Sequence, residues 1–186
     1  MAERLPYPEN PTAAQTLAAE AVVSGPRGVL VGPFVPLLRA PELMTRVQEL
    51  GAHIRYETVL EDHLRELVIL QVARHWDQEF EWGHHQPIAL AAGLPAPVVD
   101  SLSAGVQPQG ADPDVAAVWA LVHSLLTTRQ VGDDTYEAAM TVLDDRRLVE
   151  VVTTAGYYST LAMVMNAART PPEADAPRLG AATAEP

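Results

Sequence analysis

Residues 65–93 constrain the fold more than any other part of the chain. Within them, the run Leu67-Val68-Ile69-Leu70 is apolar on every side of a helix, which is typical of a helix buried in a core. A second helix is expected to follow a tight corner at His75-Trp76-Asp77, with Asp77 as its N-cap. The sequence therefore predicts that two consecutive, packed helices organise the rest of the chain.

Three titratable residues fall on these two predicted helices. Glu81 and His85 are four residues apart, so their side chains share one helix face and can touch. Glu66 lies one helix earlier and reaches the same place if the two helices pack as an antiparallel hairpin. The sequence thus predicts an imidazole between two carboxylates in a largely apolar setting.

The remaining sequence shows helical patterns separated by proline and glycine. Glu61 or Asp62 is expected to open the first helix of the central pair. Further helices are expected to open at Asn10-Pro11, Pro41, Pro95, Asp112-Pro113, Asp133 or Asp134, and Asp145. Residues 27–39 contain Pro33 and Pro36 and are predicted to form a buried irregular loop. No segment alternates convincingly between polar and apolar residues, so the predicted fold class is all-α.

The domain organisation follows from the same patterns. Residues 1–9 are predicted to be an extended N-terminal arm, residues 10–169 a single domain, and residues 170–186 a flexible tail rich in alanine and proline. The helix over residues 145–169 is apolar over more of its circumference than one small domain can bury. A subunit interface is therefore expected there.

Composition excludes several classes of function. The formal charge of −12 and the lack of a basic run argue against nucleic-acid binding. The chain has no lysine for a Schiff base and no cysteine for a disulfide, a thiolate nucleophile or a zinc site. The first eleven residues do not resemble a signal peptide, and the apolar run over residues 88–99 is too short to span a bilayer. A cytoplasmic protein that binds no membrane is expected.

The spacing Glu66-x11-Gln78-x2-Glu81-x3-His85 resembles a motif of the alkylhydroperoxidase D-like and carboxymuconolactone decarboxylase superfamily, whose peroxidase members carry Glu-x11-Cys-x2-Cys-x3-His. The segments GPRG, GPF, RELVIL, ARHWDQEFEW and GYY are similar to the cysteine-free, decarboxylase-like branch. The resemblance implies an orthogonal bundle of about six to eight helices, assembled as a homotrimer or a homohexamer.

Both cysteine positions of the motif are changed here, to Gln78 and Glu81. Because a peroxidase of this kind needs the dithiol, that reaction is chemically implausible for this chain. The resemblance then implies a cofactor-independent carbon–carbon lyase acting on a small carboxylated or lactone substrate. His85 would handle the proton, Glu66 would orient His85, and Glu81 would be a second acid or base.

Other side chains are expected to hold the substrate. Arg27 or Arg74 would receive a substrate carboxylate, since the planar guanidinium matches it. Further candidates for the pocket are His84, Phe34, Trp82 and Tyr157. The loop that begins at Arg27 is a candidate wall of the site.

Three alternatives stay open at the level of sequence. The same acid and base could serve an isomerase, a hydratase or a ring-opening enzyme, and the fold could also serve as a non-catalytic oligomeric binding module. Glu81-x-x-His84 matches an element found twice in di-iron bundles, but no second copy occurs in this chain. A single metal held by Glu66, Glu81, His84 and His85 is the third alternative, whereas the prediction is a site without metal or cofactor.

Overall fold

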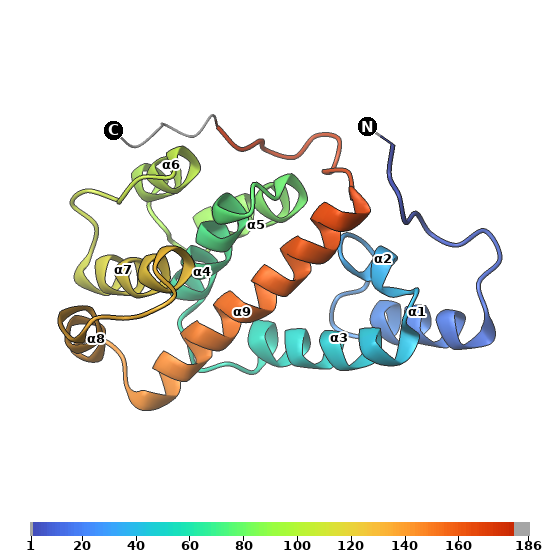
Figure 1. Ribbon diagram of the computed structural model, residues 1–186, viewed down its shortest axis with the longest axis horizontal. Helices are drawn as coiled ribbons and strands as arrows, with labels where there is room; N and C mark the ends of the chain where they lie inside the picture. Colours follow the sequence, from blue (N-terminus) through green and yellow to red (C-terminus); the bar gives the residue numbers. More distant parts are fainter. Residues whose placement is uncertain (1, 181–186) are drawn as a thin grey trace.

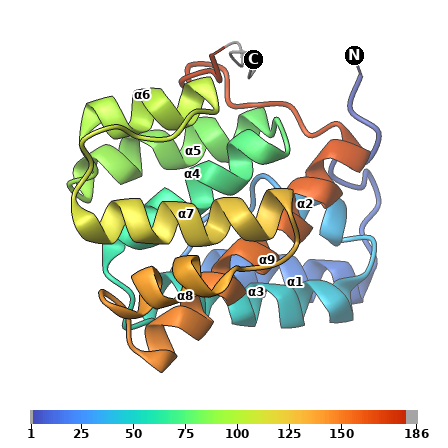
Figure 2. The ribbon, with the colours of Figure 1, turned by 60° about the vertical axis from the view of Figure 1, so that its left-hand side comes forward.

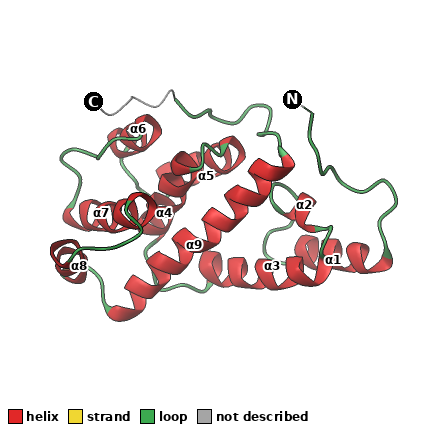
Figure 3. Ribbon diagram, in the orientation of Figure 1, coloured by secondary structure: helices red, strands yellow, loops and turns green. Residues whose placement is uncertain are grey.

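The computed structural model describes residues 2–180, and its regular structure is helical (Figures 1 and 3). In chain order the helices are α1 (Ala13–Ser24), α2 (Phe34–Leu37), α3 (Pro41–Tyr56), α4 (Asp62–His75), α5 (Glu79–Ala91), α6 (Ala96–Ala104), α7 (Pro113–Thr127), α8 (Asp133–Met140) and α9 (Asp145–Ala168). No strand occurs among these described residues. The predicted all-α class is confirmed.

The central helix is α4, as the apolar run predicts. Residues 64–73 are all buried, and α5, α6, α7 and α9 pack against this helix. Figure 2 shows α7 in front of the bundle with α8 beneath it, while α4 and α5 lie behind. One hydrophobic core connects residues of α1 through α9, so α4 fixes where the other helices can lie.

The short helix α2 was not expected, because Pro33 and Pro36 argued for a loop. Pro33 occupies the N-cap position and Pro36 the third position of this four-residue helix. The first N–H groups of a helix have no partner within the helix, so proline costs no hydrogen bond there. The two prolines are therefore compatible with one helical turn inside the otherwise irregular loop.

Two predicted helix starts are wrong. Asp77 is not the N-cap of α5: its backbone has φ of +48°, and Gln78 caps the helix by accepting a hydrogen bond from the N–H of Phe80. The Asp77 carboxylate pairs with Arg74 instead. The first helix begins after Thr12 rather than at Asn10-Pro11, because Thr12 and Gln15 form a reciprocal capping box.

Helix α9 crosses the front of the molecule diagonally in Figure 1 and packs on α4, α7, α3 and α8. Its outer face exposes Val149, Val152 and Met163, which are 62%, 42% and 46% accessible. By length and composition alone α9 could cross a bilayer, but buried core helices share these properties. The expected subunit interface and cytoplasmic location stay predictions.

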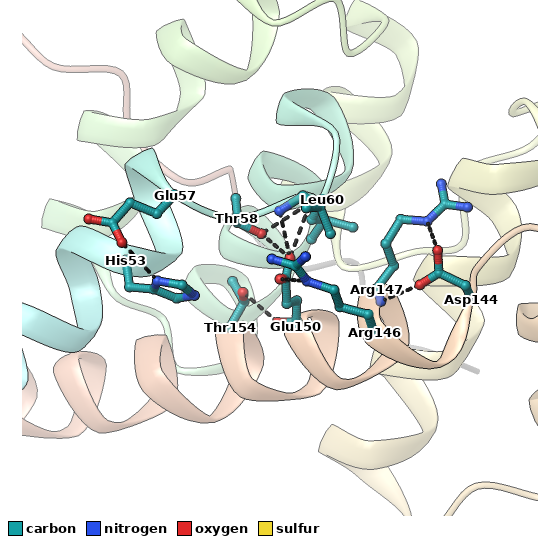
Figure 4. Close-up of polar contacts among 10 residues, drawn as sticks. His53, Glu57, Thr58, Leu60, Asp144, Arg146, Arg147, Glu150 and Thr154 are labelled. Carbon is teal, nitrogen blue, oxygen red and sulfur yellow. Dashed lines mark hydrogen bonds and ion pairs between the residues drawn. The ribbon is translucent and has the colours of Figure 1, made fainter.

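A carboxylate on α9 holds the segment that leads into α4 (Figure 4). Glu150 accepts hydrogen bonds from the backbone N–H groups of Val59 at 3.0 Å and Leu60 at 3.1 Å, and from the hydroxyl of Thr58. Arg146 pairs with the other carboxylate oxygen at 3.2 Å. These contacts fix the α3–α4 connection against α9 and so help to set the position of α4.

The two ends of the chain run over the bundle without helical structure. The arm before α1 is tied to the end of α9 by a 2.7 Å hydrogen bond from the N–H of Arg4 to the carbonyl of Ala168. Residues 170–180, part of the predicted flexible tail, pass over α5 towards α6, where the N–H of Leu179 bonds Glu79 and that of Gly180 bonds Ser103 (Figure 1). The rest of the predicted tail, residues 181–186, lies outside the described residues.

Candidate active site

A buried histidine lies between two carboxylates where α4 packs against α5. Nδ1 of His85 is 2.7 Å from Oε2 of Glu66, and Nε2 is 3.3 Å from Oε1 of Glu81. All three side chains are buried: His85 is 2% exposed, Glu66 0% and Glu81 3%. The spacing of four on α5 and the packing of α4 on α5 thus bring together the three residues that the sequence singled out.

Arg65 was not identified from the sequence. It adds a further charge next to the cluster of Glu66, His85 and Glu81. Its guanidinium donates to Asp62 at 2.7 Å and lies 3.4 Å from Oε1 of Glu66, while the side chain is almost fully buried. Neighbouring residues of a helix normally point in different directions, so the spacing of Arg65 and Glu66 gave no signal. Arg65 supplies a second positive neighbour for the buried Glu66 carboxylate.

These neighbours shift the pKa values of Glu66 and His85 in opposite directions. Burial raises the pKa of Glu66, but the charges of His85 and Arg65 outweigh it, and the net pKa lies below the usual 4.5. Burial lowers the pKa of His85, but the hydrogen bonds and charges of Glu66 and Glu81 outweigh it, and the net pKa lies above 6.5. The arrangement therefore favours a protonated imidazole beside an ionised Glu66 carboxylate.

A cavity of about 290 Å³ opens beside His85 and Glu81. The loop that begins at Arg27 forms one wall, with Val29, Val31, Pro33 and Phe34, and Leu161 of α9 adds to the apolar lining. The polar and aromatic groups on the wall are Arg27, Arg55, Tyr56, Glu81, His84, His85 and Tyr158. The cavity is large enough for a small organic molecule and is mainly apolar apart from these groups.

Arg27 is a cation on the cavity wall that has no ion pair among residues 2–180. Its guanidinium lies 4.6 Å from the centre of the Phe34 ring, and its Nε and Nη2 atoms are buried with no hydrogen-bond partner within residues 2–180. Oε2 of Glu81 is likewise buried without a partner there. Leaving buried guanidinium nitrogens without a partner is costly, so the site is well suited to an anionic group that would pair with Arg27.

Arg55 is a second cation that sequence reasoning missed. It reaches the cavity from the last turn of α3, and its charge lowers the pKa of both Glu66 and His84. Arg55 was not among the candidate substrate residues identified from the sequence. The helix continues through Gly51 to Tyr56, and this continuation carries Arg55 to the site.

Gly51 itself makes room for a contact between Tyr157 and Arg27. A Cβ atom on Gly51 would lie 2.0 Å from the hydroxyl oxygen of Tyr157 and 2.5 Å from Nη2 of Arg27. Tyr157 does not line the cavity, so its prediction as a residue that touches substrate is corrected, and its hydroxyl lies near Arg27 instead. Burial raises the pKa of Tyr157 to about 12, and the phenol is therefore neutral over the ordinary pH range.

Of the other predicted substrate residues, His84 and Phe34 lie on the cavity wall, whereas Trp82 and Arg74 do not. Trp82 is fully buried in the core. Arg74 lies at another cavity, beside α6 and α7, and donates to the backbone carbonyls of Ser103 at 3.2 Å and Gly180 at 2.8 Å. The predictions for Trp82 and Arg74 are corrected, because neither residue lines the cavity beside His85.

The single-metal alternative finds no support in the arrangement of ligands. His84 turns its Nδ1 towards Glu173 of the C-terminal segment, at 3.4 Å, and its ring stacks on Phe80. Among residues 2–180, no three acidic or imidazole side chains form a cluster that could hold a metal ion.

Part of the chain is similar to a known protein family. Residues 41–124 match the model of the Carboxymuconolactone decarboxylase family, a segment that contains Glu66, Glu81 and His85. A search of curated proteins found no match.

Several solved structures share the fold at low sequence identity. One is an uncharacterized peroxidase-related protein from Ralstonia eutropha with the alkylhydroperoxidase AhpD core (TM-score 0.73, 14% identity, covering 93% of each chain). Another is the debrominase Bmp8 in complex with 2,3,4-tribromopyrrole (TM-score 0.72, 12% identity, covering 94% of this chain and 93% of that one). A protein of unknown function from Agrobacterium tumefaciens is similar over 75% of this chain and 96% of its own (TM-score 0.67, 16% identity). At these identities the likeness shows the fold alone.

Proposed function

We propose that the protein is a cofactor-independent lyase that decarboxylates a small carboxylated or lactone substrate. The match of residues 41–124 to the Carboxymuconolactone decarboxylase family and the fold shared with AhpD-like structures support this proposal. The observation that carries the proposal is the buried His85 between Glu66 and Glu81, at a cavity whose Arg27 lacks an anionic partner. Such a site can bind an acid and deliver a proton to it.

The cysteine-free sequence separates this chain from thiol-dependent members of the superfamily. Gln78 and Glu81 stand where the peroxidase motif has cysteines, and the chain has no other thiol. Gln78 caps α5 and donates to Asn166 at 2.7 Å, so its role is structural. Glu81 faces the cavity. The motif therefore retains its proton-handling residues and has lost its electron-transferring ones.

In the proposed reaction, Arg27 anchors a carboxylate of the substrate that is not lost. The departing carboxylate lies against the apolar wall near Phe34 and Leu161, because pairing it with a cation would stabilise the ground state and oppose CO₂ release. When the carbon–carbon bond breaks, CO₂ leaves and the electron pair moves into a conjugated carbonyl, which gives an enolate. His85 then donates its proton to carbon, while Glu66 holds the imidazole in place.

Glu81 is suited to restore the proton on His85. Its Oε1 lies next to Nε2 of His85 and its Oε2 has no partner within residues 2–180, so the carboxyl can exchange protons between the cavity and the imidazole. No residue other than Glu66, Glu81 and His85 is needed for the proton transfers of this scheme.

The proposal is tested by measuring CO₂ release from a panel of lactone acids and β-keto acids. The wild-type protein is expected to decarboxylate at least one of them, and His85→Gln is expected to lose at least 100-fold in kcat, within the usual range for a general acid. Glu57→Gln, on the surface and paired with His53, is the matched control and should be fully active. Equal activity of His85→Gln and wild type would contradict the proposal.

The same experiment separates the alternatives. A product of unchanged mass and no CO₂ would indicate an isomerase, and addition of water would indicate a hydratase or a ring-opening enzyme on the same acid and base. Binding of a carboxylate without turnover of any substrate would favour a non-catalytic binding module.

We also propose that the protein assembles as a homotrimer or homohexamer through α9. Residues 151–168 contain no charged side chain, and the outer face of α9 exposes Val152 and Met163 in a chain of net charge −12. Burying this face against a second copy removes apolar surface from water without burying a charge. Nucleic acid and membranes are not expected as partners.

A further inference from the structure

Tyr158 stands on the cavity wall directly beside His85. Its ring meets the imidazole edge to face, with centres 5.3 Å apart and an angle of 88° between the planes. The side chain is only 2% exposed and lines the cavity together with Glu81 and His85. A phenol in this position can reach a molecule on which His85 acts.

The hydroxyl of Tyr158 makes no hydrogen bond with any other group of residues 2–180. Buried tyrosines usually pair their hydroxyl, because an unpaired donor loses its bond to water and gains nothing in return. The hydroxyl of the neighbouring Tyr157 is also buried without a hydrogen-bond partner among residues 2–180, but it lies near Arg27 at Gly51, and Tyr157 does not line the cavity. Of the two adjacent tyrosines, only Tyr158 therefore presents its side chain to the cavity.

The surroundings of Tyr158 keep its hydroxyl protonated. Burial raises the pKa of Tyr158 well above 10, and the negative charges of Glu81 and Glu66 raise it further, although Arg55 opposes them. The phenol thus acts as a donor of a hydrogen bond and not as a source of protons at ordinary pH.

We propose that Tyr158 is a catalytic residue whose hydroxyl donates a hydrogen bond to the oxygen that becomes negative during decarboxylation. The inference rests on the proposed function and deepens it. As the carbon–carbon bond breaks and CO₂ leaves, the electron pair moves to the carbonyl oxygen of the substrate. Tyr158 stabilises that oxygen and keeps its own proton, while His85 protonates carbon. The proposed decarboxylation requires no oxidant, reductant or cofactor.

This role restricts the substrate class. The carbon that loses CO₂ must be conjugated to a carbonyl whose oxygen lies near Tyr158 when that carbon lies near His85. Lactones and ketones with an acid in the β or vinylogous position meet this condition, and simple saturated acids do not. Tyr158 and His85 would therefore select substrates that have a conjugated carbonyl, and Arg27 would select substrates that carry a negative charge.

The test compares three tyrosine-to-phenylalanine variants in the CO₂ assay. Tyr158→Phe is expected to lower kcat by about 100-fold, the usual effect of losing one oxyanion donor, with little change in KM. Tyr157→Phe is expected to raise KM and keep kcat, since it acts through Arg27. Tyr136→Phe, on exposed α8, is the control. Because the Tyr158 hydroxyl has no protein partner to lose, its removal should not lower Tm.

A binding measurement gives a readout independent of turnover. Tetronic acid, a lactone whose enolate resembles the proposed intermediate, should bind Tyr158→Phe at least tenfold more weakly than wild type in calorimetric titration. If wild type releases CO₂ and Tyr158→Phe does so equally fast, Tyr158 is not a catalytic residue, although the proposed function stands. If wild type releases no CO₂ the proposed function fails, and equal tetronate affinity of the two proteins would overturn the role of Tyr158 as well.

Discussion

His85 and Glu66 lie 19 residues apart in the chain, on different helices, and their Nδ1 and Oε2 atoms are 2.7 Å apart in the core. A buried ion pair of this kind is rarely an efficient way to stabilise a fold, because desolvation offsets much of the attraction. Its position at the edge of a cavity with an unpaired cation instead points to proton chemistry.

Replacing Glu66 by Gln is expected to destabilise the protein and to impair the site together. The change leaves a buried imidazole without its main anionic partner, which typically costs about 3–5 kcal/mol in the free energy of unfolding. Urea denaturation measures this cost, and Glu57→Gln in the exposed His53–Glu57 pair should change it by less than about 1 kcal/mol. Similar losses in both variants would show that the Glu66–His85 contact is energetically unimportant.

The stability of the fold should depend on pH through the same pair. The folded pKa of His85 is raised, so its contribution is complete below pH 6.5 and is lost as the pH rises through the folded value. The folded pKa of Glu66 is lowered, so its contribution is present above pH 4.5 and is lost as the pH falls through the folded value. The Tm measured over a series of pH values should therefore fall both towards acid and towards alkaline pH. His85→Gln should lack the part of the alkaline decline that titrates with His85, and an unchanged alkaline decline would contradict the assignment.

The two arginines that sequence reasoning offered as carboxylate ligands make a matched pair. Arg27→Gln should raise KM by about tenfold or more at nearly constant kcat, because a charged hydrogen-bonded contact is worth about 1.5–3 kcal/mol. Arg74→Gln should leave KM unchanged, since Arg74 lies beside α6 and bonds Ser103 and Gly180. Steady-state kinetics on the best substrate checks both, and the reverse ranking would remove Arg27 from the site.

The sequence was sufficient to predict features that depend on local spacing. The apolar run in α4 predicted its burial, and the four-residue spacing of Glu81 and His85 predicted their contact. Glu66 joined them through the resemblance and through the expected helix pairing. These inferences held because each depends on one helix or on one pair of neighbouring helices.

Features that depend on the packing of distant segments could not be predicted. Arg55 reaches the cavity only because α3 continues past Gly51, and Tyr158 meets His85 only because α9 crosses α4 and α5 at one angle rather than another. The positive φ of Asp77 likewise contradicted its predicted role as a cap, since the corner is shaped by tertiary contacts of α4 and α5. The hydrophobic periodicity of a sequence does not specify the angles at which its helices cross.

The apolar outer face of α9 gives a prediction about assembly. Placing a charge there, as in Met163→Arg, is expected to dissociate the oligomer into smaller species, because the charge would be buried in the proposed interface. Sedimentation velocity measures the change. Leu17→Arg is the control, since Leu17 is an exposed apolar residue of α1, outside the proposed interface. A monomeric wild-type protein, or an oligomer untouched by Met163→Arg, would contradict an α9 interface.

The protonation of His85 is the most direct test of the proton-handling site. Titration of ¹⁵N-histidine-labelled protein by NMR, with the signals of His85 assigned through His85→Gln, should give a midpoint above 6.5 in wild type and a lower midpoint in Glu66→Gln. A wild-type midpoint at or below 6.5 that Glu66→Gln does not move would show that the imidazole is not held as a proton donor between the two acids.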